Sequence, residues 1–493
     1  MHYIRLLRAP KLLFNSGKKD AWTVNVLLTI TTDLGDAFLV PDEPVKIKIN
    51  IGRGQPTIKE KSKRCNTFGE KVLKWTAGMR VLKADIAVQH EPNPRLPHVS
   101  TGEGPLCVYI WAPSGLSAET AADVSMAGFE GDTGRIVSLW ADAHVPGSEA
   151  PTTCRRRLRL AERGSDAYVE VEEDLGESIA RHVWDAGIMS VSRLWLLTEG
   201  DPSVSAGHPL NMSTLESMLL GEDTINILEL GCGVGILGIG LARILSRDDH
   251  GETQKTILMT DLPEAEERAS ANIDRLATTC AISIRPEYEN LDWDDGKLGS
   301  FGPLVQSRSW DLVVLSDCTY NVDALPALID TWTAIHKQNV AKQPDHDHPS
   351  TTRVLVAMKV RHSDESRLWE LVKEAGWAIA EEAVMPLPML GGEAQEIFLY
   401  LFENQTQSAQ CHAANWLPVE IDDLRISMIR CPKAVSSPSK QQRFSSDPEW
   451  SSRPRAPNVS MDDYIPQPRR TALPRNSEPD EAAASCRVTM PEA

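Results

Sequence analysis

Residues that could bind a charged ligand gather in one short stretch, INILELGCGVGILGIGLA, at residues 225–242. An apolar run ends in Glu229, three glycines follow at Gly231, Gly233 and Gly235, and a second apolar run has helical spacing. This order predicts a strand, a tight turn and a helix, because glycines let the backbone turn sharply and approach a ligand closely. The N-terminus of such a helix presents unpaired N–H groups to that ligand.

Two classes of ligand use a turn of this kind. Residues 233–238 fit the G-x-G-x-x-G of dinucleotide sites, and residues 229–235 fit the acid followed by G-x-G-x-G of S-adenosylmethionine (SAM) sites. The Glu229 carboxylate favours SAM, which carries an ammonium and a sulfonium, because an acid would repel the pyrophosphate of a dinucleotide. We therefore predict SAM as the cofactor, with NAD, or a turn that binds no ligand, as alternatives.

Three further residues could hold the adenosine part of this cofactor. Asp261 ends the next predicted strand, where a carboxylate accepts hydrogen bonds from ribose hydroxyls. It could also cap the following helix, and it does not separate SAM from NAD, since both carry the ribose. Asp292 and Trp293 follow the third strand and could supply a polar group and a flat lid for adenine. The alternative for Trp293 is simple packing at a strand end.

An acid and an aromatic residue, Asp317 and Tyr320, follow the fourth predicted strand. In an open α/β sheet, ligands bind at the carboxyl ends of the strands, near the switch in strand order. There the pair could surround an amine beside the cofactor methyl. The alternative is an aspartate that only caps the next helix.

The elements that must position these residues begin at Tyr168, where strands start to alternate with helices. This alternation indicates an α/β fold with a mainly parallel sheet. Seven strands are expected from Ile225 onward, and the last two, which have no helix between them, should form an antiparallel pair at one edge. The expected later strands are 257–261, one ending at 289–291, 310–317, 353–360, 379–385 and 396–402, and the expected helices are 187–197, 263–279, 324–335 and 364–375.

The rest of the chain differs in pattern from this segment. Residues 1–150 have short alternating runs at 24–32, 45–51, 81–89, 106–112 and 136–141, which predict a β-rich accessory domain. The SAM-binding domain should span 160–405. Residues 434–493 are rich in Ser, Pro and Arg and should form a disordered tail. Residues 336–353 predict a polar surface loop, whose His346 and His348 are not expected to hold a metal. Arg155, Arg156 and Arg157 are interpreted as a solvated strand edge rather than as a nucleic-acid patch.

The composition restricts which partners and which cellular compartment are expected for the protein. The formal net charge of −18 disfavours nucleic acid as a partner. The nine cysteines form no C-x-x-C pair, which is typical of reduced thiols in the cytoplasm or nucleus. The sequence has no apolar run near the ~20 residues of a membrane helix, so no membrane contact is expected. The basic residues 1–19 could instead be a mitochondrial presequence. We expect a monomer.

Taken together, LELGCGVGILGIGLA, TDLPEAEERASANI, LDWDD, WDLVVLSDCTYN and the upstream HVWDAG resemble the class I SAM-dependent methyltransferases of family 16. The resemblance covers residues 165–403, and that group contains the seven-strand protein-lysine methyltransferases. It implies a Rossmann-like sheet of seven strands. It also implies roles for the residues already named: Glu229, Gly231, Gly233 and Gly235 at the methionine part of SAM, Asp261 at the ribose, Asp292 and Trp293 at the adenine, Trp184 near the cofactor, and Asp317 and Tyr320 at the substrate pocket.

The expected reaction is an in-line attack of a protein lysine amine on the SAM methyl, with no metal. A free lysine is an ammonium at neutral pH, because its pKa is about 10.4. Asp317 could attract the ammonium, and the sulfonium could favour its deprotonation. Nucleic-acid amine methyltransferases, which carry prolines where Cys318 and Thr319 stand, and small-molecule amine methyltransferases are the main alternatives. A fold that binds SAM without catalysis and an NAD oxidoreductase remain as further alternatives. The β-rich region and the tail are departures from a minimal family member, so the resemblance does not identify the substrate.

Overall fold

The structure is a computed structural model, and all of its described residues lie within Met1–Val419. The described residues are 1–15, 21–53, 67–88, 105–113, 115–127, 134–161, 167–176, 181–199, 210–221, 223–247, 254–279, 282–342, 352–391 and 393–405. The predicted disordered tail, 434–493, lies outside them, as do His346 and His348.

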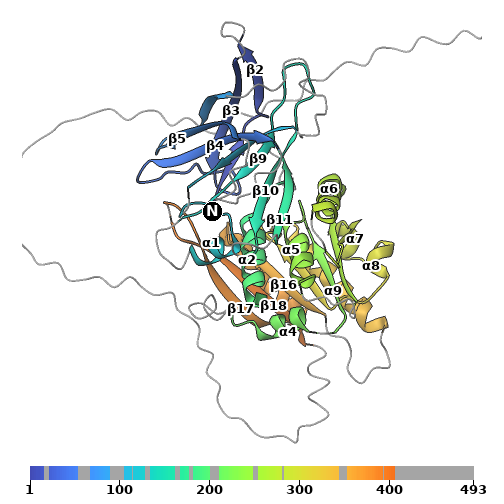
Figure 1. Cartoon of the computed structure of the whole chain (residues 1–493). Coiled ribbons are helices and arrows are strands. Elements are labelled where there is room, and N and C mark those ends of the chain that lie inside the picture. The colour runs from blue at the N-terminus through green and yellow to red at the C-terminus, as the bar shows by residue number, and fades with distance from the viewer. Residues whose placement is uncertain are drawn as a thin grey trace, which may run out of the picture. The chain divides into compact units, whose positions relative to one another are not determined.

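The N-terminal part forms two mainly antiparallel sheets (Figure 1). Sheet A has the order β2 (Lys11–Asn15), β3 (Ala21–Thr31), β1 (His2–Leu6) and β8 (Ile136–Val137), and β6 (Leu82–Val88) also pairs with β3. Sheet B has the order β11 (Tyr168–Asp174), β10 (Thr153–Arg159), β9 (Leu139–Asp142), β7 (Leu106–Trp111), β4 (Val45–Arg53) and β5 (Thr67–Trp75).

Alternation explains how these two sheets share a core. In β4, Val45, Ile47, Ile49 and Ile51 are buried, while the residues between them are partly or fully exposed. They join a cluster that includes Val26, Leu28 and Ile30 of sheet A. This pattern is expected of strands that present one face to a core and the other outward.

The boundary of the predicted accessory domain is a proposal rather than an observed break. Sheet B continues through β10 and β11 to Asp174, well past the predicted limit at residue 150. Val169 and Val171 of β11 pack in the same cluster as Ile188 and Ile236 of the following α/β part. We therefore treat residues 1–176 as a region that packs on the α/β part, and we call it the N-terminal region.

The α/β part is built on a third sheet, sheet C, whose seven strands confirm the predicted fold class. Its order is β14 (Glu287–Asn290), β13 (Lys255–Asp261), β12 (Ile225–Leu230), β15 (Leu312–Ser316), β16 (Arg353–Met358), β18 (Gln395–Asn404) and β17 (Trp377–Leu387). The first five strands are parallel, whereas β18 runs antiparallel to both β16 and β17, as predicted for the last two strands. The strand order reverses between β12 and β15.

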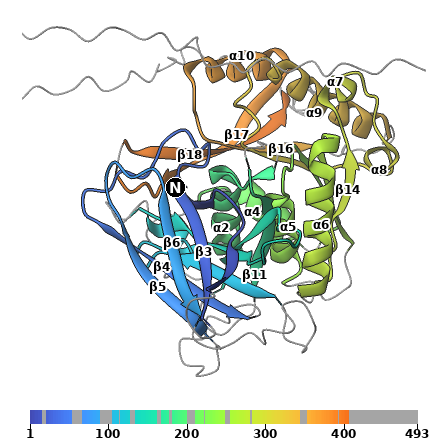
Figure 2. The same ribbon diagram turned by 90° about the horizontal axis from the view of Figure 1, so that it is seen from above.

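Helices cover both faces of sheet C (Figure 2). One group of helices packs against the face that carries Ile227 of β12, and a second group packs against the face that carries its neighbour Leu228. The first group is α2 (Asp185–Glu199), α4 (Ser213–Leu220), α5 (Ile236–Leu245) and α6 (Pro263–Thr279). The second is α7 (Trp293–Gly296), α8 (Pro303–Gln306), α9 (Leu325–Lys342) and α10 (Arg367–Glu374). Both faces of the central strands are thus buried, which explains their continuous apolar sequences.

Two local predictions need correction. The polar loop expected from residue 336 begins later, because α9 continues to Lys342 and buries His336 against Trp377. The helix expected over 364–375 starts as a 3-10 turn at Ser363–Ser366 before α10.

Candidate active site

The glycine turn joins β12 to α5 as predicted. Gly231, Gly233 and Gly235 have φ values of 67°, 55° and 84°, a region that side chains other than glycine rarely adopt. A Cβ atom on Gly231 would also lie 2.6 Å from Cys318 Sγ and 3.1 Å from the Trp293 ring. The turn therefore needs glycine for both its conformation and its packing.

Glu229 is buried at the end of β12, directly before this turn. Its Oε2 accepts a hydrogen bond from the Gly238 N–H at 3.0 Å. Its Oε1 is buried and has no hydrogen-bond partner among the described residues. Burial raises the pKa of this carboxyl well above its usual range. An unsatisfied buried oxygen of this kind is a receptor for a cationic group, and the ammonium of SAM fits it.

Asp261 ends β13 beside the glycine turn. One carboxylate oxygen accepts from the Gly233 N–H and the other from the Leu262 N–H, each at 2.7 Å. Burial raises the pKa of Asp261, against the effect of these two hydrogen bonds. The carboxylate keeps further lone pairs for ribose hydroxyls, so its predicted role remains compatible with the structure.

Asp292 and Trp293, the predicted adenine contacts, lie at the start of α7. Asp292 caps this short helix by accepting from the Asp294 N–H at 2.9 Å. Trp293 is partly buried in the core cluster and its ring lies against Gly231. The structure thus brings Trp293 to the glycine turn, and the contact with adenine remains a prediction for both residues.

Asp317 follows β15 at the reversal of strand order, with its backbone in the left-handed region at φ 53°. This conformation is uncommon outside glycine and is found at functional sites. Its Oδ2 accepts from the Ala186 N–H at the start of α2, at 2.7 Å, and its Oδ1 accepts from Arg361 at 2.7 Å. Burial raises the pKa of Asp317 to about 7, against the lowering effect of Arg361. The structure thus gives Asp317 a cationic partner that the sequence did not indicate.

Trp184 and Tyr320 form the aromatic part of the site. Their rings stack, with centroids 6.3 Å apart and an angle of 8° between their planes. Tyr320 is 41% exposed, so its ring is accessible, while the Arg361 guanidinium lies 5.1 Å from the Trp184 ring centre. The predicted residues Trp184, Asp317 and Tyr320 therefore meet at one place.

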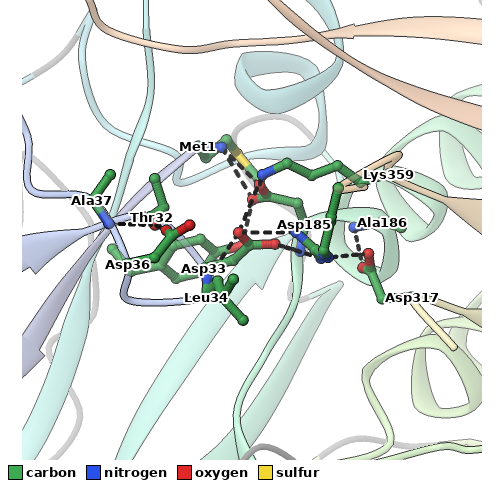
Figure 3. A network of polar contacts seen from close by, with 12 residues as sticks. Met1, Thr32, Asp33, Leu34, Asp36, Ala37, Asp185, Ala186, Asp317 and Lys359 are labelled. Atoms are coloured by element: carbon green, nitrogen blue, oxygen red, sulfur yellow. Dashed lines mark hydrogen bonds and ion pairs between the residues drawn. The ribbon is translucent and has the colours of Figure 1, made fainter. Parts of the chain in front are cut away.

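Charged residues that the sequence analysis missed lie in one polar network with Asp317 (Figure 3). Asp33, in the segment that follows β3, accepts from Arg361 at 3.0 Å and from Lys359 at 3.1 Å. Lys359 also donates to Asp185 at 2.9 Å, and Asp185 accepts from the Tyr3 hydroxyl. The sequence held a signal for Lys359 and Arg361, because they lie at the carboxyl end of the predicted fifth strand, 353–360, where ligands bind in such sheets.

Comparison with known proteins decides the class of this site. Residues 164–375 match a family model described as lysine methyltransferase. This part of the chain is a SAM-dependent methyltransferase domain. The match confirms the resemblance to family 16 and the predicted cofactor.

Individual relatives of the methyltransferase domain are distant. A UPF0665 family protein of Schizosaccharomyces pombe is 23% identical over 379 residues, which cover 76% of this chain and 93% of that protein. TYW2 of M. jannaschii in complex with AdoMet is 11% identical, covers 52% of this chain and 89% of that one, and has a TM-score of 0.29. A SAM-dependent methyltransferase of Methanosarcina mazei is 14% identical, covers 38% and 94%, and has a TM-score of 0.26. Structural similarities with TM-scores this low support no conclusion about function.

Within the described ranges, no group of three or more His, Cys, Asp or Glu side chains is arranged to hold a metal ion. No described helix has the length and apolar character needed to cross a membrane.

Proposed function

We propose that this methyltransferase transfers a methyl group from SAM to the ε-amino group of a lysine in a protein substrate. The observation that carries the proposal is the accessible Tyr320 ring, stacked on Trp184 beside Asp317 at the carboxyl end of β15. Aromatic faces attract cationic and alkyl groups, and a carboxylate complements an ammonium. The description of the matched family as lysine methyltransferase supports the same substrate class.

In this proposal, different residues of the site bind the cofactor and position the substrate. SAM, when bound, supplies an electrophilic methyl on a sulfonium. Glu229, the glycine turn and Asp261 hold and orient it. Tyr320 and Trp184 position the side chain that carries the amine, and Asp317 contributes negative charge next to it. Most of the rate should come from holding the amine and the methyl in line.

The test is transfer of labelled methyl groups from SAM to a cell extract by the full-length protein, with Asp317→Asn as the inactive control. Acid hydrolysis and amino-acid analysis of the labelled protein should show methylated lysine. Label that is removed by nuclease, or that stays in the small-molecule fraction, would instead identify a nucleic-acid or small-molecule amine as the substrate.

A further inference from the structure

A carboxylate of the N-terminal region reaches into the methyltransferase site. Asp33 lies just beyond the end of β3, more than 300 residues before Arg361 in the sequence. Its side chain is fully buried, and the side chains of Arg361 and Lys359 are each 7% exposed. A carboxylate in such a place is stable only if cations compensate it.

The contacts form a chain from Asp33 to Asp317 (Figure 3). One guanidinium nitrogen of Arg361, Nη2, lies 3.0 Å from Asp33 Oδ2 and 2.7 Å from Asp317 Oδ1. Arg361 thus holds two carboxylates at once, one from each part of the protein. Because guanidinium is planar and rigid, fixing it at Asp33 also fixes where it meets Asp317.

The segment that carries Asp33 is itself held in place. The Asp33 carboxylate accepts from the Leu34 N–H at 2.9 Å, and its backbone carbonyl accepts from Arg5 of β1 at 2.5 Å. On the other side, the Glu365 carboxylate accepts from the N–H groups of Arg361 and His362 at 2.8 and 3.0 Å. The segment that carries Asp33 and the segment that carries Arg361 are therefore each held by further hydrogen bonds to their own backbone.

We propose that the N-terminal region completes the active site: Asp33 is a positioning residue that holds Arg361 against Asp317 and against the Trp184 ring. Asp33 acts through Arg361. In this arrangement the Arg361 guanidinium orients the Asp317 carboxylate and favours its ionised form, and Asp33 fixes the position of the guanidinium. The inference rests on the proposed function for its catalytic consequence, but not for the geometry of the contact.

The first test is structural and needs no substrate. Crystal structures of the full chain with Asp33→Asn and with the control Asp36→Asn should differ at Arg361. Asp36 lies in the same segment, is exposed, and accepts from the Thr32 hydroxyl at 2.5 Å, outside the Asp33–Arg361–Asp317 chain. We expect Arg361 to leave its place between Asp317 and Trp184 in Asp33→Asn and to keep it in the control. An unmoved Arg361 in Asp33→Asn would overturn the proposal.

The second test measures the consequence with labelled SAM and the cell extract. Asp33→Asn should lower methyl transfer at least tenfold, Asp33→Glu should recover at least a third of that loss, and Asp36→Asn should transfer normally. Binding of S-adenosylhomocysteine, measured by calorimetry, should change less than threefold in all three. Equal losses of ligand binding and transfer in Asp33→Asn would indicate a structural role only and contradict the proposal.

A third variant covers the case in which Asp33→Asn does not fold. Arg361→Lys keeps the positive charge and leaves the Asp33–Lys359 contact in place, but a lysine cannot hold two carboxylates in the same rigid geometry. It should also lose at least tenfold in transfer, and normal transfer by it would refute the positioning chain. If the unmodified protein methylates nothing in the extract, the proposed function fails, while the crystal structures still decide whether Asp33 positions Arg361.

Discussion

At the scale of single residues, Asp317 should separate chemistry from cofactor binding. Asp317 accepts from the Ala186 N–H and is the proposed substrate-side carboxylate, whereas Glu229 and Asp261 flank the glycine turn. Asp317→Asn should lower methyl transfer by about 10²-fold or more, the usual effect of removing a positioned polar group, with little change in S-adenosylhomocysteine affinity. Calorimetry and the labelled-SAM assay on the same protein preparation measure both. If Asp317→Asn lost as much ligand affinity as methyl transfer, Asp317 would have to be assigned to the cofactor site instead.

Asp261→Ala should show the opposite behaviour. It removes the acceptor of the Gly233 N–H as well as the predicted partner of the ribose. S-adenosylhomocysteine binding should weaken by ~1–3 kcal/mol, the cost of hydrogen bonds lost in a buried site. An unchanged dissociation constant would show that the ribose binds elsewhere.

The buried carboxyl of Glu229 should release a proton when the cofactor binds. Burial raises its pKa well above the usual range, so the empty site favours the protonated carboxyl. A cationic ammonium beside Oε1 favours the ionised form and lowers that pKa, so the proton leaves as the ligand binds. The binding enthalpy of S-adenosylhomocysteine at pH 7 should therefore depend on the ionisation enthalpy of the buffer. Glu229→Gln should remove this dependence, and its persistence in that variant would point to another group.

At the scale of elements, the close packing of α5 on sheet C can be tested at Gly238. A Cβ there would lie 2.5 Å from Glu229 Oε2 and 2.7 Å from Met259 Cγ. Gly238→Ala should destabilise the protein by ~1–3 kcal/mol in urea unfolding, as overpacking typically does, and should weaken ligand binding by displacing Glu229. The matched control is Gly176→Ala, whose Cβ meets no atom within 4 Å and which should leave both properties unchanged.

Much of sheet C and its helices could be predicted because their sequences are long and periodic. The helix at 263–279 was predicted at its observed limits, and the strand pair β17–β18 was predicted from the missing helix between the two strands. The N-terminal region was less readable. TCRRRLR of β10 was expected only as a solvated strand edge, yet its middle arginine, Arg156, is buried beside Glu173 at 2.5 Å. The expectation that Arg156 is solvated was therefore wrong.

Residues of the candidate site could be predicted where the strands and turns that carry them could be predicted. Gly231 and Asp317 were found because their position follows from the order of strands and turns within one segment. Asp33 could not be found in this way, since it meets Lys359 and Arg361 only after two distant parts of the chain pack together. Nothing in its local sequence distinguishes it from other aspartates after a strand.

At the scale of the whole molecule, the N-terminal region and the methyltransferase domain should unfold as one unit. A buried ion pair joins them, because Asp33 meets Arg361. Within the N-terminal region, the pair of Arg156 and Glu173 holds β10 and β11 beside the segment that leads to α2. Arg156 also donates to the Ile4 carbonyl of β1 at 2.9 Å, and the Val183 N–H donates to Glu173 at 3.2 Å. Differential scanning calorimetry should show a single transition for these parts, and two well-separated ones would contradict this packing.

The same ion pairs predict how that transition depends on pH. Burial alone would raise the pKa values of Asp33 and Glu173, but Arg361 and Lys359 in one case and Arg156 in the other bring them below their usual range. Carboxyls with lowered pKa values stabilise the fold above their unfolded pKa of about 4, and this stabilisation is lost as the pH falls toward their folded pKa values. Asp317 has the opposite sign, since its pKa is raised to about 7. Between about pH 4 and pH 7 the unfolded state has lost this proton while the folded state still holds it, so stability falls as the pH rises across that window and then levels off. The melting temperature should therefore decline steeply as the pH falls below about 4 and decline gently as the pH rises from about 4 to 7. Glu173→Gln should lower the melting temperature at neutral pH and flatten the acid decline, whereas Asp317→Asn should flatten only the decline between about pH 4 and 7. An acid decline unchanged in Glu173→Gln would mean that other carboxyls control it.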